Sequence, residues 1–161
     1  MILEIVAIGT GATLAYDLWT VVRRRWLAMP LPDWRRIGRW LAGLPRGRFV
    51  HAPDGDTPPV RGEAAVGWGF HYAVGIAFAA ALVALAGAGW LQAPTLAPAL
   101  AVGVATSAAP FVVLQPGLGI GLFARRAARP WIVRLHTLLG HAMFGVGLYL
   151  TALAWRVLVL P

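Results

Sequence analysis

The sequence contains no cysteine and no lysine, and only 6 of its 161 residues are acidic. Without cysteine there are no disulfides, no thiolate metal sites and no cysteine nucleophile, and the redox compartment stays undetermined. Charged residues make up only 12% of the chain, whereas hydrophobic residues make up 59%. A soluble domain of this length cannot bury so much apolar surface. The composition therefore predicts a protein of the lipid bilayer.

The charge of the chain is strongly positive, with 14 basic residues and a formal net charge of +8. All 14 basic residues are arginines. Such a balance is often typical of nucleic-acid binding. Here the arginines lie between long apolar stretches, which is the pattern of a membrane protein. We therefore expect no nucleic-acid partner.

Four stretches are long and apolar enough to cross a bilayer, which takes about 20 residues. The predicted fold class is an all-α integral membrane protein, with one four-helix transmembrane bundle in residues 1–161 and one short interfacial helix. The predicted spans are about 2–22, 64–91, 96–124 and 131–160.

Arginine placement predicts the orientation of these spans. Thirteen of the 14 arginines lie in two places: the connection 23–63, and the region from the end of the third span to the start of the fourth. Because cytoplasmic connections of membrane proteins are enriched in arginine and lysine, both regions are expected in the cytoplasm. Both termini are then expected on the periplasmic side.

The connection 23–63 contains a predicted amphipathic helix at about 33–44. Asp33 is a good N-cap, and the apolar residues that follow fall within one arc of the helix at about 100° per residue. This pattern is typical of a helix that lies among lipid headgroups, and a lid over the cytoplasmic face is the alternative. The arginines on the opposite face, which we expect to contact anionic headgroups, are Arg35, Arg36 and Arg39.

Each predicted span brings a polar side chain to a similar depth, about 8 to 15 Å from its cytoplasmic end at 1.5 Å per residue. Ionisable groups in hydrocarbon are costly, so they usually face the protein interior and mark functional sites. The predicted buried cluster consists of Asp17, His71, Gln115, His136 and His141. A polar stripe on the same helical face as Asp17 supports it and consists of Thr10, Thr13 and Thr20.

The third predicted span contains Pro110 and Pro116. Each proline removes one helical hydrogen bond, so the sequence predicts a kinked helix. In lipid the freed carbonyl groups need partners within the protein or in water. A broken helix of this kind often lines a substrate site, and a plain packing kink is the alternative.

Several functions fit this pattern. The favoured one is handling of a small solute or proton by the buried cluster, in a homo-oligomer because four helices are few for one pathway. A structural or accessory subunit is the next alternative, followed by a redox protein in which His71 and His141 hold haem or a metal. An enzyme acting on lipid headgroups lacks any nucleophile motif. We therefore expect a protein that is not an enzyme and needs no cofactor.

Six short segments resemble a known family of small membrane proteins. They are ATLAYDLW at 12–19, GRW at 38–40, GWGFHYAVG at 67–75, PTLAPAL at 94–100, QP at 115–116 and HAMFGVGLY at 141–149. Together they resemble the domain-of-unknown-function family 2938 over nearly the whole chain. The resemblance implies a bacterial inner-membrane protein, and it implies no activity, substrate or site residue.

Overall fold

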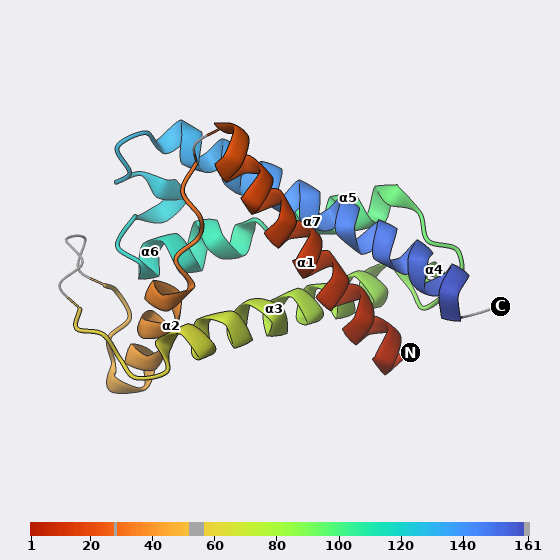
Figure 1. Cartoon of the computed structure of the whole chain (residues 1–161), viewed down its shortest axis with the longest axis horizontal. Coiled ribbons are helices and arrows are strands. Elements are labelled where there is room, and N and C mark those ends of the chain that lie inside the picture. The colour runs from red at the N-terminus through yellow and green to blue at the C-terminus, as the bar shows by residue number, and fades with distance from the viewer. Residues whose placement is uncertain (28, 52–56, 160–161) are drawn as a thin grey trace. The chain divides into compact units, whose positions relative to one another are not determined.

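A computed structural model describes residues 1–27, 29–51 and 57–159, and these residues form helices and turns without any strand (Figure 1). Residues 28 and 52–56 of the predicted connection, and residue 160 of the predicted fourth span, lie outside the described residues. In chain order the helices are α1 (Ile2–Leu27), α2 (Trp34–Gly43), η1 (Leu44–Arg46), α3 (Glu63–Ala86), α4 (Gly89–Gln92), α5 (Leu96–Ala105), η2 (Pro110–Leu114), α6 (Gln115–Gly117), η3 (Leu122–Ala124) and α7 (Pro130–Val159).

Within the described residues, four helical stretches are long and apolar enough to cross a membrane, as the sequence predicts. They are Ile2–Leu27, Glu63–Ala86, Leu96–Gly117 and Pro130–Val159. The ends differ from the predicted ones. Helix α1 continues through the arginines that follow the apolar run, where basic side chains in the last turn interact favourably with the helix dipole. Helix α3 stops at Ala86 because Gly87 adopts a left-handed conformation, with φ 84°, that ends the helix.

The third stretch is broken rather than smoothly kinked. Helix α5 ends at Ala105, and the chain makes a turn at Thr106 and Ser107 before the helical path resumes. The cause is Pro110, which has no N–H to offer to the carbonyl group of Thr106 one turn earlier. Beyond the turn, η2 is a π-helix whose last bond runs from the Gln115 N–H to the Pro110 carbonyl.

The third stretch also ends earlier than predicted, at Gly117 instead of near residue 124. Gly119 and Gly121 both adopt left-handed conformations, with φ 78° and 82°, which turn the chain out of the helix. Phe123 and Ala124 follow with φ 50° and 56°. For non-glycine residues this region of backbone space is strained, so the segment after α6 is a tight, irregular turn.

The chain divides into two compact units. The first unit contains residues 1–31, 72–106 and 138–161, and the second contains residues 32–71 and 107–137. Helices α3 and α7 contribute residues to both units, whereas α5 belongs to the first and α6 to the second.

Glycines let the helices of the first unit approach closely. A Cβ on Gly9 of α1 would collide with the α3 backbone at Ile76, and a Cβ on Gly103 of α5 would collide with α7 at Gly145. Small residues at crossing points are the usual means of close helix packing in membranes. The buried core that surrounds these crossings consists of Ile8, Ala12, Ala79, Leu82, Val83, Trp90, Leu91, Ala99, Phe144, Leu148 and Ala152.

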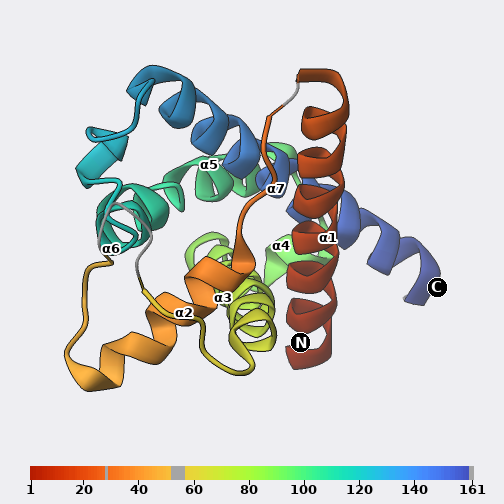
Figure 2. The ribbon, with the colours of Figure 1, turned by 60° about the vertical axis from the view of Figure 1, so that its left-hand side comes forward.

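The second unit is built around α2, which packs on the start of α3 (Figure 2). The buried residues Ile37, Trp40 and Leu118 form its core. The Trp40 ring lies over Gly117, where any added Cβ would collide with the indole. The indole N–H of Trp40 donates to the carbonyl oxygen of Phe49 at 2.9 Å, so the ring is also fixed at its polar edge.

Candidate functional site

An acidic side chain and a phenol form a pair within the first unit. The hydroxyl group of Tyr72 on α3 donates to the Asp17 carboxylate on α1, with 3.0 Å between the two oxygens. Asp17 and Tyr72 are both half-buried. Asp17 is a predicted site residue and Tyr72 is not. The sequence feature that could have indicated Tyr72 is its place directly after His71 in an otherwise apolar span.

The threonine stripe on α1 is mostly buried. The side chains of Thr13 and Thr20 donate to the backbone carbonyl groups of Gly9 and Asp17, both at 2.7 Å. Thr13 is 1% exposed, and it meets α3 at Gly75, where a Cβ would collide with the Thr13 hydroxyl. Thr10 is half-buried. Thr13 therefore packs α1 against α3, and the hydroxyl groups of Thr13 and Thr20 are both bonded to carbonyl groups of α1 itself.

His141 of α7 is hydrogen-bonded to Thr106, which lies at the broken end of α5. The Thr106 hydroxyl oxygen lies 3.0 Å from His141 Nδ1 and 2.6 Å from the carbonyl oxygen of Gly103. The Phe78 ring of α3 lies 6.4 Å from the imidazole, measured between ring centroids. All four residues belong to the first unit.

Gln115 is a buried amide in the second unit. It is 6% exposed, and its Nε2 donates to the Thr137 hydroxyl at 3.2 Å. That hydroxyl in turn donates to the Val133 carbonyl at 2.8 Å, so it can only accept from Gln115. The amide orientation is therefore fixed, and within the described part of the chain Gln115 Oε1 has no hydrogen-bond partner.

His71 stacks on an aromatic side chain of the second unit. Its ring lies 3.9 Å from the Trp34 ring between centroids, with 25° between the planes. Trp68 lies edge-on to the same imidazole at 5.9 Å. The stacking joins α2 to the first turns of α3, where Trp68 and His71 lie.

The predicted cluster divides between the two units. Asp17 and His141 belong to the first unit, and His71, Gln115 and His136 belong to the second. His136 is half-buried on α7. A shared layer of all five side chains therefore stays a prediction, as does a pairing of His71 with His141 on a haem or metal. Within the described residues, no group of three or more His, Asp or Glu side chains is placed to hold a metal ion.

The arginines of α2 make contacts within the second unit. The guanidinium group of Arg39 binds the Glu63 carboxylate through two bonds, of 2.8 and 3.0 Å, and also donates to the Thr57 carbonyl at 2.7 Å. The Val60 N–H donates to the same carboxylate at 2.9 Å. These bonds connect α2, the chain before α3 and the first residue of α3.

The other two arginines of α2 differ in exposure. Arg36 donates to the Leu118 carbonyl at 2.9 Å, and its backbone N–H donates to the N-cap side chain of Asp33 at 3.0 Å. Arg35 lies 3.8 Å from Glu63 but is 73% exposed. Among the three predicted headgroup contacts, Arg35 is therefore the most accessible.

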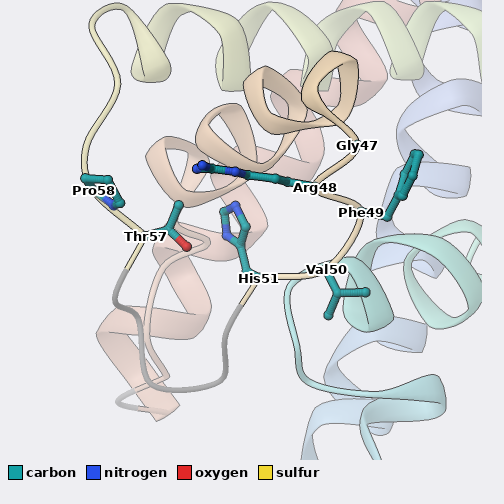
Figure 3. A pocket seen from close by; sticks show the side chains of 7 residues that line it. All are labelled: Gly47, Arg48, Phe49, Val50, His51, Thr57 and Pro58. Carbon is teal, nitrogen blue, oxygen red and sulfur yellow. The ribbon is translucent and has the colours of Figure 1, made fainter.

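A pocket of about 460 Å³ lies beside α2 in the second unit. Figure 3 shows the His51 ring, the Arg48 side chain and the Thr57 hydroxyl close to one another, with Phe49 pointing away. His51 is buried, and its backbone N–H donates to the Gly117 carbonyl at 2.8 Å. Burial lowers the pKa of His51 below its ordinary 6.5, and the guanidinium groups of Arg36 and Arg39 lower it further. The pocket wall therefore favours a neutral imidazole.

Comparison with known proteins gives one match. No curated protein and no solved structure matches the chain. A family model does match, and it covers residues 6–155, which is nearly the whole sequence. With four apolar helices of membrane-spanning length and this match, the chain belongs to the family described as Protein of unknown function (DUF2938).

Proposed function

We propose that this protein is an inner-membrane protein of bacteria that handles protons, or a small solute together with protons, through ionisable groups inside its helical bundle. The observation that supports this most is the Asp17–Tyr72 hydrogen bond between two helices of membrane-spanning length. A carboxyl group in hydrocarbon costs several kcal/mol unless it is paired or hydrated, and such groups commonly belong to proton relays.

The chemistry of the pair suits proton exchange. A charged Asp17 accepts the Tyr72 hydroxyl proton in a hydrogen bond, whereas a protonated Asp17 can donate to the phenol oxygen instead. The two side chains therefore keep a hydrogen bond in both states of the carboxyl group. Proton uptake then changes the charge of α1 without breaking the contact between the two side chains.

His141 supplies a second group of the same kind in the first unit. A neutral imidazole both donates and accepts, and it is the side chain whose charge changes most readily near neutral pH. Its bond to Thr106 places it at the break that follows α5, where Pro110 has no N–H to offer to the Thr106 carbonyl group. Such breaks in membrane helices commonly line polar pathways.

The membrane placement is part of the proposal. The arginine-rich connections lie in the cytoplasm and the termini in the periplasm, and the exposed Arg35 side chain contacts anionic lipid headgroups. Since four helices enclose little space, a homo-oligomer forms the complete pathway.

The test is proton flux into liposomes that contain the purified protein and a pH-sensitive dye. We expect Asp17→Asn to reduce flux at least about tenfold, because the amide cannot exchange a proton, and we expect Tyr72→Phe to reduce it less. Glu4→Gln is the matched control, since Glu4 is the other acid of α1 and pairs with the Met1 amino group at 2.7 Å. Unchanged flux in folded Asp17→Asn would show that Asp17 is a structural contact, and the accessory-subunit alternative would then replace the proposal.

A further inference from the structure

The hydrogen bonds around Thr106 determine which nitrogen of His141 carries a hydrogen. The Thr106 hydroxyl oxygen lies 2.6 Å from the Gly103 carbonyl oxygen. Two oxygen atoms at this distance need a proton between them, and a carbonyl oxygen has none to give. The single hydroxyl proton of Thr106 therefore points at Gly103.

The same hydroxyl oxygen lies 3.0 Å from His141 Nδ1. Because its proton is used at Gly103, the hydroxyl group can only accept at this second contact. Nδ1 must then be the donor. We infer that His141 carries its hydrogen on Nδ1, that it takes up and releases its exchangeable proton at Nε2, and that Thr106 is the residue that positions the ring for this role.

The packing of α5 on α7 makes this contact possible. A Cβ on Gly103 would collide with the backbone at Gly145 and with the His141 carbonyl oxygen, so the two helices approach as closely as backbones can. Thr106 lies almost one turn after Gly103, and His141 lies one turn before Gly145. The glycine crossing therefore brings a hydroxyl on one helix within reach of an imidazole on the other.

This arrangement has a consequence for proton exchange, and to that extent it rests on the proposed function. Both the neutral ring with hydrogen on Nδ1 and the doubly protonated ring donate from Nδ1 to Thr106. Uptake of a proton at Nε2 therefore leaves the bond to Thr106 unchanged. The ring holds its position through both charge states.

The inference is tested by nitrogen NMR of the protein labelled with ¹⁵N-histidine in lipid nanodiscs at alkaline pH. Two-bond correlations from the ring protons distinguish a protonated Nδ1 from a protonated Nε2. The protein has 4 histidines, and the signals of His141 are assigned by their loss in His141→Asn. We expect the Nδ1–H form at His141. If the wild-type protein shows the Nε2–H form there, that result by itself overturns the inference.

Variants of Thr106 test the positioning role. Thr106→Ser keeps the hydroxyl group and should keep the Nδ1–H form, whereas Thr106→Val removes the acceptor and should allow the Nε2–H form to appear. An Nδ1–H form that persists unmixed in folded Thr106→Val would show that another group sets the tautomer. Since the NMR result does not depend on transport, a wrong tautomer and an absent proton flux are separate failures.

Discussion

Gly38 of α2 and Gly67 of α3 lie face to face, so that a Cβ on Gly67 would sit 3.1 Å from the backbone nitrogen of Gly38. The same Cβ would collide with the carbonyl group of Trp34. A Cβ on Gly38 would likewise collide with the carbonyl group of Glu63. Backbone atoms cannot move aside as a flexible side chain does. The crossing of α2 and α3 therefore requires two glycines.

Gly67→Ala should accordingly destabilise the protein, by about 1–3 kcal/mol or more, because the added methyl group overpacks a backbone contact. Thermal unfolding in detergent measures the effect. Gly69→Ala is the matched control on the same helix, since apart from that helix no atom in the described part of the chain lies within 4 Å of a Cβ there. Alanine in an open helical position should be neutral or stabilising by about 0.5–1 kcal/mol. Equal effects of the two substitutions would contradict the close crossing.

Removal of the Arg39–Glu63 pair should loosen the start of α3. We expect Arg39→Gln and Glu63→Gln each to lower the unfolding temperature, because either change leaves polar partners of the other residue unsatisfied. Since the two side chains bind each other, the double variant should be little worse than either single variant. Arg35→Gln removes a longer contact with Glu63, of 3.8 Å, from an exposed side chain, so it should have little effect. Additive losses would show that the two residues act separately.

Acid should destabilise the protein through His51. The folded protein holds the pKa of His51 below its value in the unfolded chain, so the unfolded chain binds more protons when the pH lies between the two values. Stability then rises with pH across this window, up to about 6.5, and is lost as the pH falls through it. Unfolding temperatures at a series of pH values measure the slope. His51→Gln should flatten the rise of unfolding temperature with pH below about pH 6.5. An unchanged rise would show that other groups cause the pH dependence.

Gln115 Oε1, which has no hydrogen-bond partner among the described residues, predicts a stabilising substitution. Gln115→Met has a similar volume, removes a buried unsatisfied acceptor that costs about 1–3 kcal/mol, and loses one hydrogen bond worth about 0.5–1.5 kcal/mol. We therefore expect a net gain of roughly 1 kcal/mol in the free energy of unfolding. Thr137→Val should be destabilising, because it leaves the Gln115 amide without its acceptor. A loss of stability in Gln115→Met would mean that a donor from solvent or solute occupies the oxygen.

Hydropathy predicts the four long apolar helical stretches well, because length and apolar composition are local properties of the chain. The ends of these stretches are harder to predict. The third stretch stops at Gly117 since Gly119 and Gly121 turn the chain, and glycine alone does not reveal whether it will adopt a left-handed conformation. Pro110 indicates the break in this stretch, but not the π-helix that follows it.

The partners of the candidate site residues were not predictable from the sequence. Asp17 stands out because it is a charge in an apolar span, but its contact with Tyr72 depends on how α1 and α3 are rotated about their axes. Arg39 illustrates the same difficulty. Its position opposite the apolar face of α2 predicts lipid headgroup contact, and the sequence does not reveal that its guanidinium group binds Glu63, the first residue of α3.

The contacts of α2 also imply an order of assembly during synthesis. The Gly38–Gly67 crossing joins segments that are close in the sequence, so it can form as soon as the first turns of α3 have been made. The cover over the Trp40 ring comes from Gly117, which is synthesised only after α5. Until Gly117 has been made, the face of the Trp40 indole that packs on it stays uncovered there. The second unit is thus completed in two stages, and Trp40 is buried in the later one.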